Sequence, residues 1–316
     1  MTDPRSATDP PLWVVTGPTA SGKTALALAL AERHGLEIAS MDSMAVYRHM
    51  DIGTAKPTAA ERERVPHHLI DLVEPHETFD TARWCDAAAA LLDAARARGR
   101  RLLFVGGTPL YLMAFFKGMM QGPAADPALR AELAAREAAE PGALFAELQR
   151  EDPAAAARID RRDQRRIVRA LEVLRKTGRP ISEQQDHFAR PDFLRPCRIV
   201  AMQRDRDELH ARVRERTERM LDAGLLAETE AIERGGGFSA TSGAAIGYAE
   251  CRLFLRGRFK DRQELRTRIR RNTHQLIRRQ TTWFRRLPQI RWLRPEAGVD
   301  ALETELLAAA SGRDDR

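Results

Sequence analysis

The chain has few cysteines, and it lacks long apolar runs. Cys85, Cys197 and Cys251 are far apart and form no CxxC pair, which argues against a disulfide framework or a zinc knuckle and indicates thiols in a reducing compartment. No apolar run approaches the roughly 20 residues that a membrane-spanning helix needs. The opening residues, MTDPRSATDPP, resemble neither a signal peptide nor a transit peptide. We therefore expect a cytoplasmic protein with no membrane partner.

Positive charge is concentrated in one segment. The 316 residues carry a net charge of +7, but residues 252–294 hold fifteen Lys or Arg against two acids, a local charge of +13 that leaves −6 for the remainder. A clustered basic segment is typical of a surface that binds nucleic acid. A solvated basic helix without a partner would have the same composition.

Strands alternating with helices predict an α/β fold. Apolar runs at 12–15, 38–40, 68–73 and 101–105 have the length of buried strands, and an alanine-rich helical pattern covers 81–98. This alternation indicates a parallel sheet wrapped by helices. One more strand is expected at 198–202, followed by long helices to the end of the chain.

The middle of the chain has a different character. Between 121 and 190, helical patterns rich in Ala, Glu and Arg are broken by prolines and glycines, and no strand pattern is evident. We therefore predict an α/β core formed by residues 1–118 and 195–316, with basic C-terminal helices. An all-helical domain at 119–194 is expected to interrupt it.

The segment TGPTASGKTA, residues 16–25, has the Gly-x-x-x-x-Gly-Lys-Thr pattern of a phosphate-binding loop between a strand and a helix. Glycines let the backbone curl so that its N–H groups face an anion, and the helix adds its positive end. Lys23 supplies a charge, and Thr24 offers a hydroxyl to Mg²⁺. The pattern does not reveal what is attached to the phosphates.

The acid that phosphate-loop ATPases place after a later strand is missing from the clearest candidate, because residues 102–105 lead into Gly106-Gly107-Thr108. Asp71 is a weaker option. Asp42 is best placed, at the carboxyl end of the second expected strand, where sites in open α/β sheets gather. Asp42 would also suit a small-molecule kinase, so its position leaves both interpretations open.

The stretch DSMAVYRHMDIGTAKPT, which starts at Asp42, is long and irregular. Together with GPTASGKT, VPHHLIDLVEP, VGGTPLY, RALEV and RRQTTWFR, it resembles the tRNA dimethylallyltransferase (tRNA isopentenyltransferase) family over about Val14 to Arg286. The resemblance implies a P-loop NTPase-like parallel sheet core with an inserted all-helical domain. It also implies that the loop holds dimethylallyl diphosphate rather than ATP. The dimethylallyl group would pass to the exocyclic amine of the adenosine 3′ of the anticodon, position 37, with release of diphosphate.

The resemblance assigns roles to matching positions. Asp42 would be the general base, and Thr108 would help to hold the amine. Mg²⁺ is the expected cofactor, with Thr24 as its ligand. The residues expected to surround the diphosphate are Gly17, Thr19, Ala20, Ser21, Gly22, Lys23, Thr24, Arg212 and Arg216.

Contacts with the anticodon stem-loop of tRNA are implied in four segments, and we expect the protein to act as a monomer. A solvated helix face is the alternative for the arginines at 165–169, and Trp283 is expected to pack rather than to stack on a base. The implied contact residues are Asp42, Ser43, Met44, Ala45, Arg165, Arg166, Ile167, Val168, Arg169, Ala244, Ala245, Ile246, Gly247, Tyr248, Ala249, Gln275, Arg278, Arg279 and Gln280.

Three positions depart from the family pattern. Ala45 stands where many members have Gln, Arg161-Arg162 replaces Pro-Asn, and Ala249 replaces Lys or Arg. All three belong to the RNA side, so the reaction is better supported than the details of tRNA recognition.

Two other functions remain open from the residues alone. A phosphate-loop kinase of a small metabolite would use Asp42 on Mg²⁺ or on the acceptor, but it would have no use for the basic segment. An RNA-binding protein with a degenerate loop would have no need to keep Lys23 and Thr24 intact.

Overall fold

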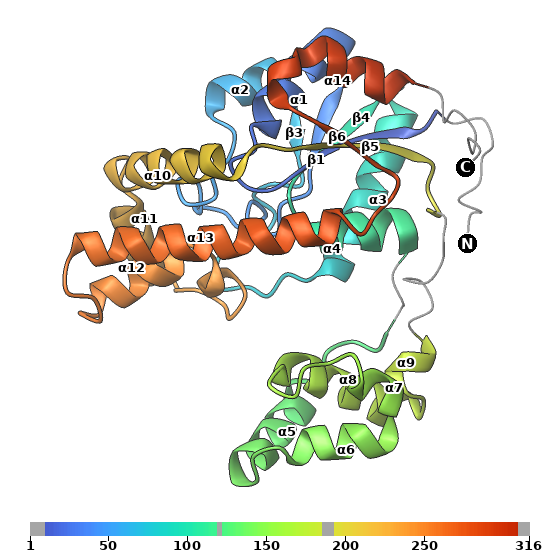
Figure 1. Cartoon of the computed structure of the whole chain (residues 1–316), viewed down its shortest axis with the longest axis vertical. Helices are drawn as coiled ribbons and strands as arrows, with labels where there is room; N and C mark the ends of the chain where they lie inside the picture. Colours follow the sequence, from blue (N-terminus) through green and yellow to red (C-terminus); the bar gives the residue numbers. More distant parts are fainter. Residues whose placement is uncertain (1–9, 119–121, 185–192, 309–316) are drawn as a thin grey trace. The chain divides into compact units, whose positions relative to one another are not determined.

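The computed structural model describes residues 10–118, 122–184 and 193–308 (Figure 1). The chain forms two compact units, one made of 1–116 with 195–316 and the other of 117–194. We call them the core unit and the helical unit and describe each by itself. Among the described residues, no helix is long and apolar enough to cross a membrane.

The core unit is built on a six-stranded sheet in which every pairing is parallel. The strand order is β3-β2-β4-β1-β5-β6, so β1 lies between β4 and β5 near the middle. This arrangement confirms the predicted α/β fold. The strands are β1 Leu12–Thr16, β2 Glu37–Ser40, β3 His67–His68, β4 Leu102–Val105, β5 Cys197–Met202 and β6 Ile290–Leu293.

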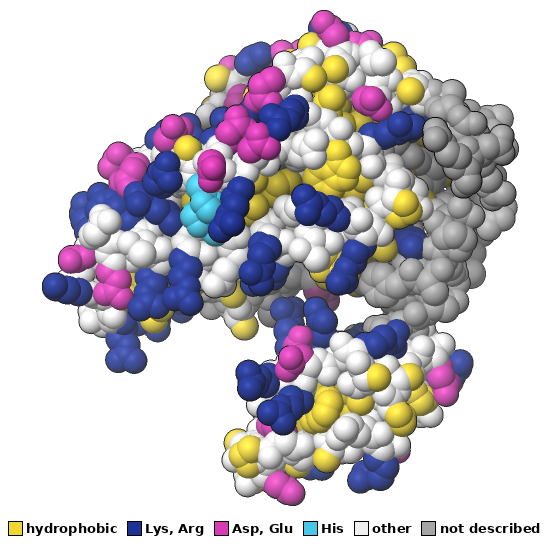
Figure 2. All heavy atoms as spheres, in the orientation of Figure 1, with side chains coloured by type: hydrophobic (Ala, Val, Ile, Leu, Met, Phe, Trp, Pro, Cys, Tyr) yellow, Lys and Arg dark blue, Asp and Glu magenta, His cyan; other side chains and the backbone are white. Residues whose placement is uncertain are grey.

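Helices connect the strands and extend beyond the sheet. The long helices α10 (Arg206–Asp222) and α13 (Arg262–Phe284) pack against each other, as do α11 (Leu225–Arg234) and α12 (Tyr248–Leu255). Figure 2 shows Lys and Arg side chains spread over the face on which α13 lies. The remaining helices of this unit are α1 Lys23–His34, α2 Ala59–Arg64, α3 Thr81–Ala97, α4 Pro109–Leu112 and α14 Gly298–Leu307.

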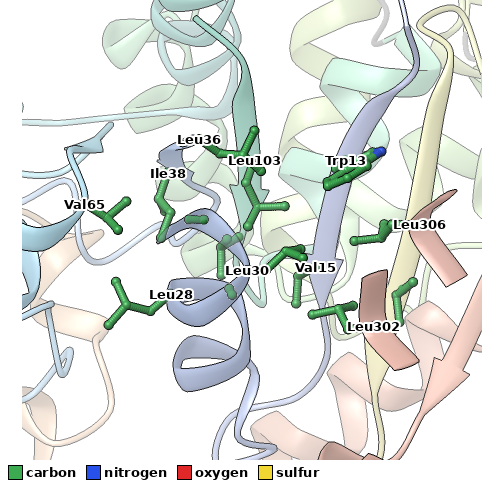
Figure 3. Close-up of a cluster of buried hydrophobic side chains, with 14 of the residues drawn as sticks. Trp13, Val15, Leu28, Leu30, Leu36, Ile38, Val65, Leu103, Leu302 and Leu306 are labelled. Carbon is green, nitrogen blue, oxygen red and sulfur yellow. The ribbon is translucent and has the colours of Figure 1, made fainter. Parts of the chain in front are cut away.

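Side-chain alternation along the strands fills two separate cores, because successive residues of a strand point to opposite faces. Trp13 and Val15 of β1 and Leu103 of β4 belong to one apolar cluster, together with Leu30 of α1 and Leu302 of α14 (Figure 3). This cluster joins α1 and α14 to the same face of the sheet.

An aromatic cluster fills the opposite face. Phe104 of β4, between two residues of the first cluster, contacts Phe115 and Phe116 of the π-helix Met113–Gly118. Trp84 of α3 stacks on Tyr111 of α4, with 4.3 Å between ring centroids. The short α4 is thereby held in place directly after the β4 turn.

Two predictions for the sheet were wrong. The strand expected at 68–73 is limited to β3, because Leu69 and Asp71 have positive φ angles of 61° and 55°. That turn places the Asp71 carboxylate on Lys56 at 2.6 Å. The expectation of helices alone after residue 202 missed β6, a short edge strand of sequence IRWL with only one neighbour.

The helical unit has its own apolar core, which includes Leu133, Leu144, Leu148 and Leu171. Asp126, Asp152 and Asp163 cap the N-termini of three of its helices by accepting hydrogen bonds from backbone N–H groups. The helices are α5 Pro127–Ala139, α6 Ala143–Glu151, α7 Pro153–Ala156, α8 Gln164–Thr177 and α9 Ile181–Gln184. The all-helical insertion predicted from the sequence is therefore present.

A buried carboxylate ties this unit together. Glu172 of α8 is fully buried and accepts hydrogen bonds from Arg130 at 2.8 Å, from Arg169 at 2.6 Å and from the amide of Asp126 at 2.7 Å. Burial by itself would raise the pKa of Glu172, but these hydrogen bonds outweigh it and lower the pKa to about 2. The ionised form is therefore the stabilising one.

We expect Glu172→Gln to lower the free energy of unfolding of the helical unit by about 3 kcal/mol at neutral pH, because it removes the buried charge that Arg130 and Arg169 share. The stability that ionised Glu172 gives the wild type should be fully present above the pKa of Glu172 in the unfolded chain, about 4.3. It should disappear as the pH falls towards 2. Urea unfolding of the full chain at several pH values measures this. Glu132→Gln, at an exposed ion pair with Arg175, is the control and should cost less than about 1 kcal/mol. Equal losses in the two variants would contradict the role of Glu172.

Candidate functional site

Three chain segments meet where β2, β4 and β1 end. These strands are neighbours in the sheet, so their carboxyl ends share one edge. The amide of Met41 donates to the carbonyl of Val105 at 2.8 Å, and the amide of Thr108 donates back to Met41 at 3.2 Å. The amide of Gly106 donates to Val15 at 3.2 Å. Backbone hydrogen bonds thus hold Asp42, Thr108 and the phosphate loop beside one another.

The loop between β1 and α1 has the curled backbone expected of an anion cradle. Gly17 has φ 133°, and a Cβ built there would lie 2.7 Å from the carbonyl oxygen of Met202. Gly22 has φ 92° and is the N-cap of α1, where no side chain caps the helix. The first N–H groups of α1 therefore remain free to bind an anion.

Lys23 and Arg216 bring two positive charges to this cradle. Burial lowers the pKa of Lys23 to about 8; the charge of Asp42 raises it, and Arg216 lowers it further. Burial also lowers the pKa of Arg216, while the charge of Asp42 raises it. The Arg216 guanidinium lies 3.4 Å from the carbonyl of Thr54, and Arg212 donates to the carbonyl of Ala20 at 2.8 Å. The two cations therefore share one carboxylate, and the site favours an added anion.

Asp42 and Thr108 are held by local backbone contacts. The Oδ1 atom of Asp42 accepts a hydrogen bond from the amide of Met44 at 2.8 Å, which fixes the carboxylate at the start of its turn. Thr108 precedes α4 but does not cap it, because its hydroxyl accepts from the amide of Ser43 at 3.1 Å. Within the residues that the structure describes, the Oδ2 atom of Asp42 has no hydrogen-bond partner and is available to a ligand.

Ser21 contributes a second available polar atom. Its hydroxyl is buried and has no hydrogen-bond partner among the described residues. Its carbonyl accepts from Arg204 at 3.1 Å, which holds the middle of the loop against the end of β5. A buried hydroxyl without a partner is costly unless a ligand satisfies it.

Several residues expected to contact tRNA are buried instead. Tyr248 lies fully inside the core unit, where its hydroxyl bonds to Glu228 and accepts from the amide of Gly53 at 3.1 Å. Ile167 packs in the core of the helical unit. Ala45 and Ala245 are buried as well. These side chains stabilise the fold, so RNA contacts at these positions would have to come from neighbouring atoms.

Gln280 was also expected to face RNA, but its side chain is buried. Its carbonyl oxygen accepts from the amide of Thr19 at 2.9 Å, and its amide nitrogen donates to Gly107 at 2.7 Å. It therefore faces the phosphate loop. The sequence assigned the residue to the correct region but to the wrong side of α13.

Other expected RNA residues are exposed. In the core unit, Gln275 and Arg278 line a groove of about 960 Å³ between α10 and α13, in which His210 and His274 stack with 4.0 Å between ring centroids. Arg279 is exposed on the same helix. The exposed or half-buried members of the first three segments include Ser43, Met44, Arg165, Arg166, Val168, Ala244, Ile246 and Ala249.

Arg169 differs from its exposed neighbours on α8. It is held by the Glu172 carboxylate at 2.6 Å and by the carbonyl of Pro123 at 3.0 Å. Among the described residues, the Arg166 guanidinium has one acidic partner, the partly exposed Asp163 at 3.2 Å. Arg165 and Arg166 are therefore the arginines of this segment most available to a phosphate.

The donors available to a metal ion are few. Among the described residues, no group of three or more His, Cys, Asp or Glu could hold one. Asp71 is paired with Lys56 at 2.6 Å and with Arg62 at 2.8 Å, which removes it as a magnesium ligand. Thr24 is exposed at the first turn of α1. Such a donor set fits Mg²⁺ only when phosphate oxygens and water supply most of the ligands.

Glu228 was not recognised from the sequence. Its carboxylate accepts from the amides of Asp51 at 3.1 Å and Ile52 at 3.0 Å, and it also bonds to Tyr248. The segment after Asp51 is thereby fixed where Thr54 meets Arg216. Asp51 and Ile52 are more than 170 positions from Glu228, so no local pattern could have paired them.

The family described as IPP transferase matches residues 45–287, and the family described as isopentenyl transferase matches residues 10–74. The chain belongs to the IPP transferase family. It is 46% identical over 295 residues to a tRNA dimethylallyltransferase of Ralstonia pickettii, covering 90% of each chain. It is 45% identical over 302 residues to that of Methylococcus capsulatus, covering 93% of this chain and 94% of the relative.

Solved structures agree with this IPP transferase assignment. The full-length tRNA isopentenylpyrophosphate transferase of Bacillus halodurans superimposes with a TM-score of 0.68 at 36% identity, covering 94% of this chain and 95% of its own. A eukaryotic dimethylallyltransferase acting on tRNA gives a TM-score of 0.76 at 24% identity, covering 95% of this chain and 77% of its own. At 24% identity, the second similarity supports the fold alone.

The lowered pKa of Lys23 predicts a pH dependence for anion binding. The protonated amine attracts an anion, and with a pKa of about 8 most of it is neutral by pH 9 in the free protein. We expect the dissociation constant of inorganic pyrophosphate to rise above pH 8, by up to about tenfold per unit. Titration calorimetry measures this, and Lys23→Arg is the control because its guanidinium stays protonated. Parallel profiles for both proteins would show that Lys23 does not titrate in this range.

Proposed function

We propose that this chain transfers the dimethylallyl group of dimethylallyl diphosphate to the exocyclic amine of adenosine 37 in tRNA and releases diphosphate. The observation that carries the proposal is the convergence of Lys23, Asp42 and Arg216 at a phosphate loop beside Thr108. Transferase activity on tRNA is the activity named for the relatives that match over about nine-tenths of the chain.

In this proposal the loop binds the diphosphate of the isoprenoid. The free N–H groups at the start of α1, the Ser21 hydroxyl, Lys23 and Arg216 supply donors and positive charge, while Arg212 holds the loop through Ala20. When the bond between the allylic carbon and the diphosphate oxygen breaks, negative charge grows on the leaving diphosphate. Preorganised donors stabilise that charge without reorganisation, which lowers the barrier.

Asp42 acts on the other reactant. The adenine amine is a poor nucleophile, and its nitrogen becomes positive as it forms a bond to the allylic carbon. The free Oδ2 of Asp42 takes the proton from that nitrogen, while Oδ1 stays fixed by Met44. The Thr108 hydroxyl accepts a hydrogen bond from the amide of Ser43 and helps to hold the adenine amine. The N–C bond forms, the C–O bond breaks, and the proton goes to the carboxylate.

Mg²⁺ would be held by Thr24 together with oxygens of the diphosphate and water. The single hydroxyl at the first turn of α1 fits this arrangement, in which the substrate provides most of the ligands. Bound there, the ion would neutralise part of the diphosphate charge.

The RNA side of the proposal uses exposed positions in each unit. The α10–α13 groove, with Gln275 and Arg278, would contact phosphates, and so would Arg165 and Arg166 of the helical unit. Residues 119–194 would thus serve as an RNA-binding domain inserted in a catalytic core. A cytoplasmic monomer suits this assignment.

The kinase alternative required Asp42 or Asp71 to serve Mg²⁺. Asp71 is occupied by Lys56 and Arg62, and the family assignment favours transfer of the isoprenoid. A kinase would also turn over ATP, so absence of prenylated adenosine with rapid ATP hydrolysis would overturn the proposal.

We expect Asp42→Asn to reduce kcat by about a hundred- to ten-thousand-fold, because the amide cannot accept the proton. Its affinity for pyrophosphate should stay within a few-fold, since the amide oxygen can still accept from Met44. Steady-state kinetics with unmodified tRNA and pyrophosphate titration on the same variant measure both quantities. A surviving rate, or a collapse of pyrophosphate affinity, would remove Asp42 as the base.

For the helical unit, we expect Arg165→Gln with Arg166→Gln to weaken tRNA binding and to flatten its salt dependence. Each lost phosphate contact should reduce the log–log slope by about 0.7–0.9. Filter binding at several salt concentrations measures the slope. Arg150→Gln, an exposed arginine of α6 paired with Glu151, is the matched control and should leave the slope unchanged. An unchanged slope in the double variant would return these arginines to a solvated helix face.

A further inference from the structure

Gln280 uses both ends of its side-chain amide inside the core unit. The residue is 7% exposed and lies towards the C-terminal end of α13. Its Oε1 accepts from the amide of Thr19 at 2.9 Å, and its Nε2 donates to the carbonyl of Gly107 at 2.7 Å. One side chain therefore joins the loop after β1 to the turn after β4.

The space around this bridge is tightly packed. A Cβ added to Gly107 would lie 2.8 Å from Nε2 of Gln280, 3.2 Å from the carbonyl oxygen of Gly17 and 3.6 Å from Nζ of Lys23. A side chain at Gly107 would therefore push the bridge out of place. Gly107 allows the loop, the amide of Gln280 and Lys23 to approach one another.

One of the two joined segments carries the groups proposed to bind the leaving diphosphate, and the other lies beside the proposed base. The loop carries Lys23 and the donors for the leaving diphosphate. Gly107 directly precedes Thr108, whose hydroxyl binds the amide of Ser43 beside Asp42. The separation of these segments fixes how far the base lies from the leaving group.

The bridge comes from a helix with a second role. α13 also exposes Gln275, Arg278 and Arg279, the residues assigned above to RNA. A helix of 23 residues is stiff, so the face towards the groove and the face towards the loop move together.

We propose that Gln280 is a positioning residue of the transferase, not an RNA contact. It holds the diphosphate loop and the Thr108 turn at the separation that the transfer requires. This inference rests on the proposed function and extends it to a residue on the opposite side of α13 from the groove.

The test compares Gln280→Met with Gln263→Met on the same helix. Methionine has a similar length but makes neither amide hydrogen bond. We expect Gln280→Met to lower kcat by about 10- to 100-fold, because small displacements of reacting groups are costly. Pyrophosphate should bind about 2- to 10-fold more weakly through the loosened loop. Affinity for tRNA should change by less than about twofold.

Gln263→Met is the control. It should leave kcat and the pyrophosphate dissociation constant at wild-type values, because its side chain is exposed in the first turn of α13 and the residue belongs to neither the loop nor the RNA groove. If Gln280→Met instead weakens tRNA binding and leaves both other quantities unchanged, Gln280 is an RNA contact and the proposal is overturned. Unchanged values of all three would also overturn it.

Gly107→Ala disturbs the same bridge, because its methyl group would press on Nε2 of Gln280. It replaces Gln280→Met in the test if that variant does not fold. A similar loss of kcat with normal tRNA affinity is expected, and a wild-type kcat would overturn the proposal. Failure of the proposed function is separate: the wild type would then bind pyrophosphate but form no prenylated adenosine.

Discussion

Two half-buried cations, Lys23 and Arg216, lie near one carboxylate, Asp42, and set the electrostatics of the phosphate loop. Lys23 and Arg216 both lose solvation, and Asp42 offsets only part of that cost. In a site of low dielectric, such an excess of positive charge is stable only when an anion joins it. The loop, with its free N–H groups and the unpartnered Ser21 hydroxyl, provides the shape for that anion. A diphosphate ligand would therefore complete the electrostatics of the fold.

Much of the surrounding structure holds these charges in place. Glu228 gathers the amides of Asp51 and Ile52 and the hydroxyl of Tyr248, and so fixes the turn that presents the Thr54 carbonyl to Arg216. The irregular segment after Asp42 thus follows its course because the half-buried Glu228 of α11 and the buried Tyr248 of α12 satisfy part of its backbone. Ala45, near the start of this segment, is buried where a direct RNA contact was expected.

In the helical unit, too, two cations share one carboxylate. Glu172 pairs with Arg130 of α5 and with Arg169 of α8 and so links the two helices beside their apolar core. Arg169 is thereby committed to the fold, while Arg165 and Arg166 remain exposed to solvent. One buried carboxylate thus separates the arginine that is held in the fold from the two that face solvent.

The sequence by itself determined the phosphate loop, most strands and helices, the helical insertion and the family, because these depend on glycine placement, side-chain periodicity and short motifs. It also brought Lys23, Asp42 and Thr108 to neighbouring strand ends. Only the tertiary structure decided which way individual side chains point. Three side chains point into the interior because their partners come from distant segments or from a packed core: Gln280, Tyr248 and Ile167. The edge strand β6 and the turn at Asp71 were also set by distant partners, β5 and Lys56, which leave no local pattern in the chain.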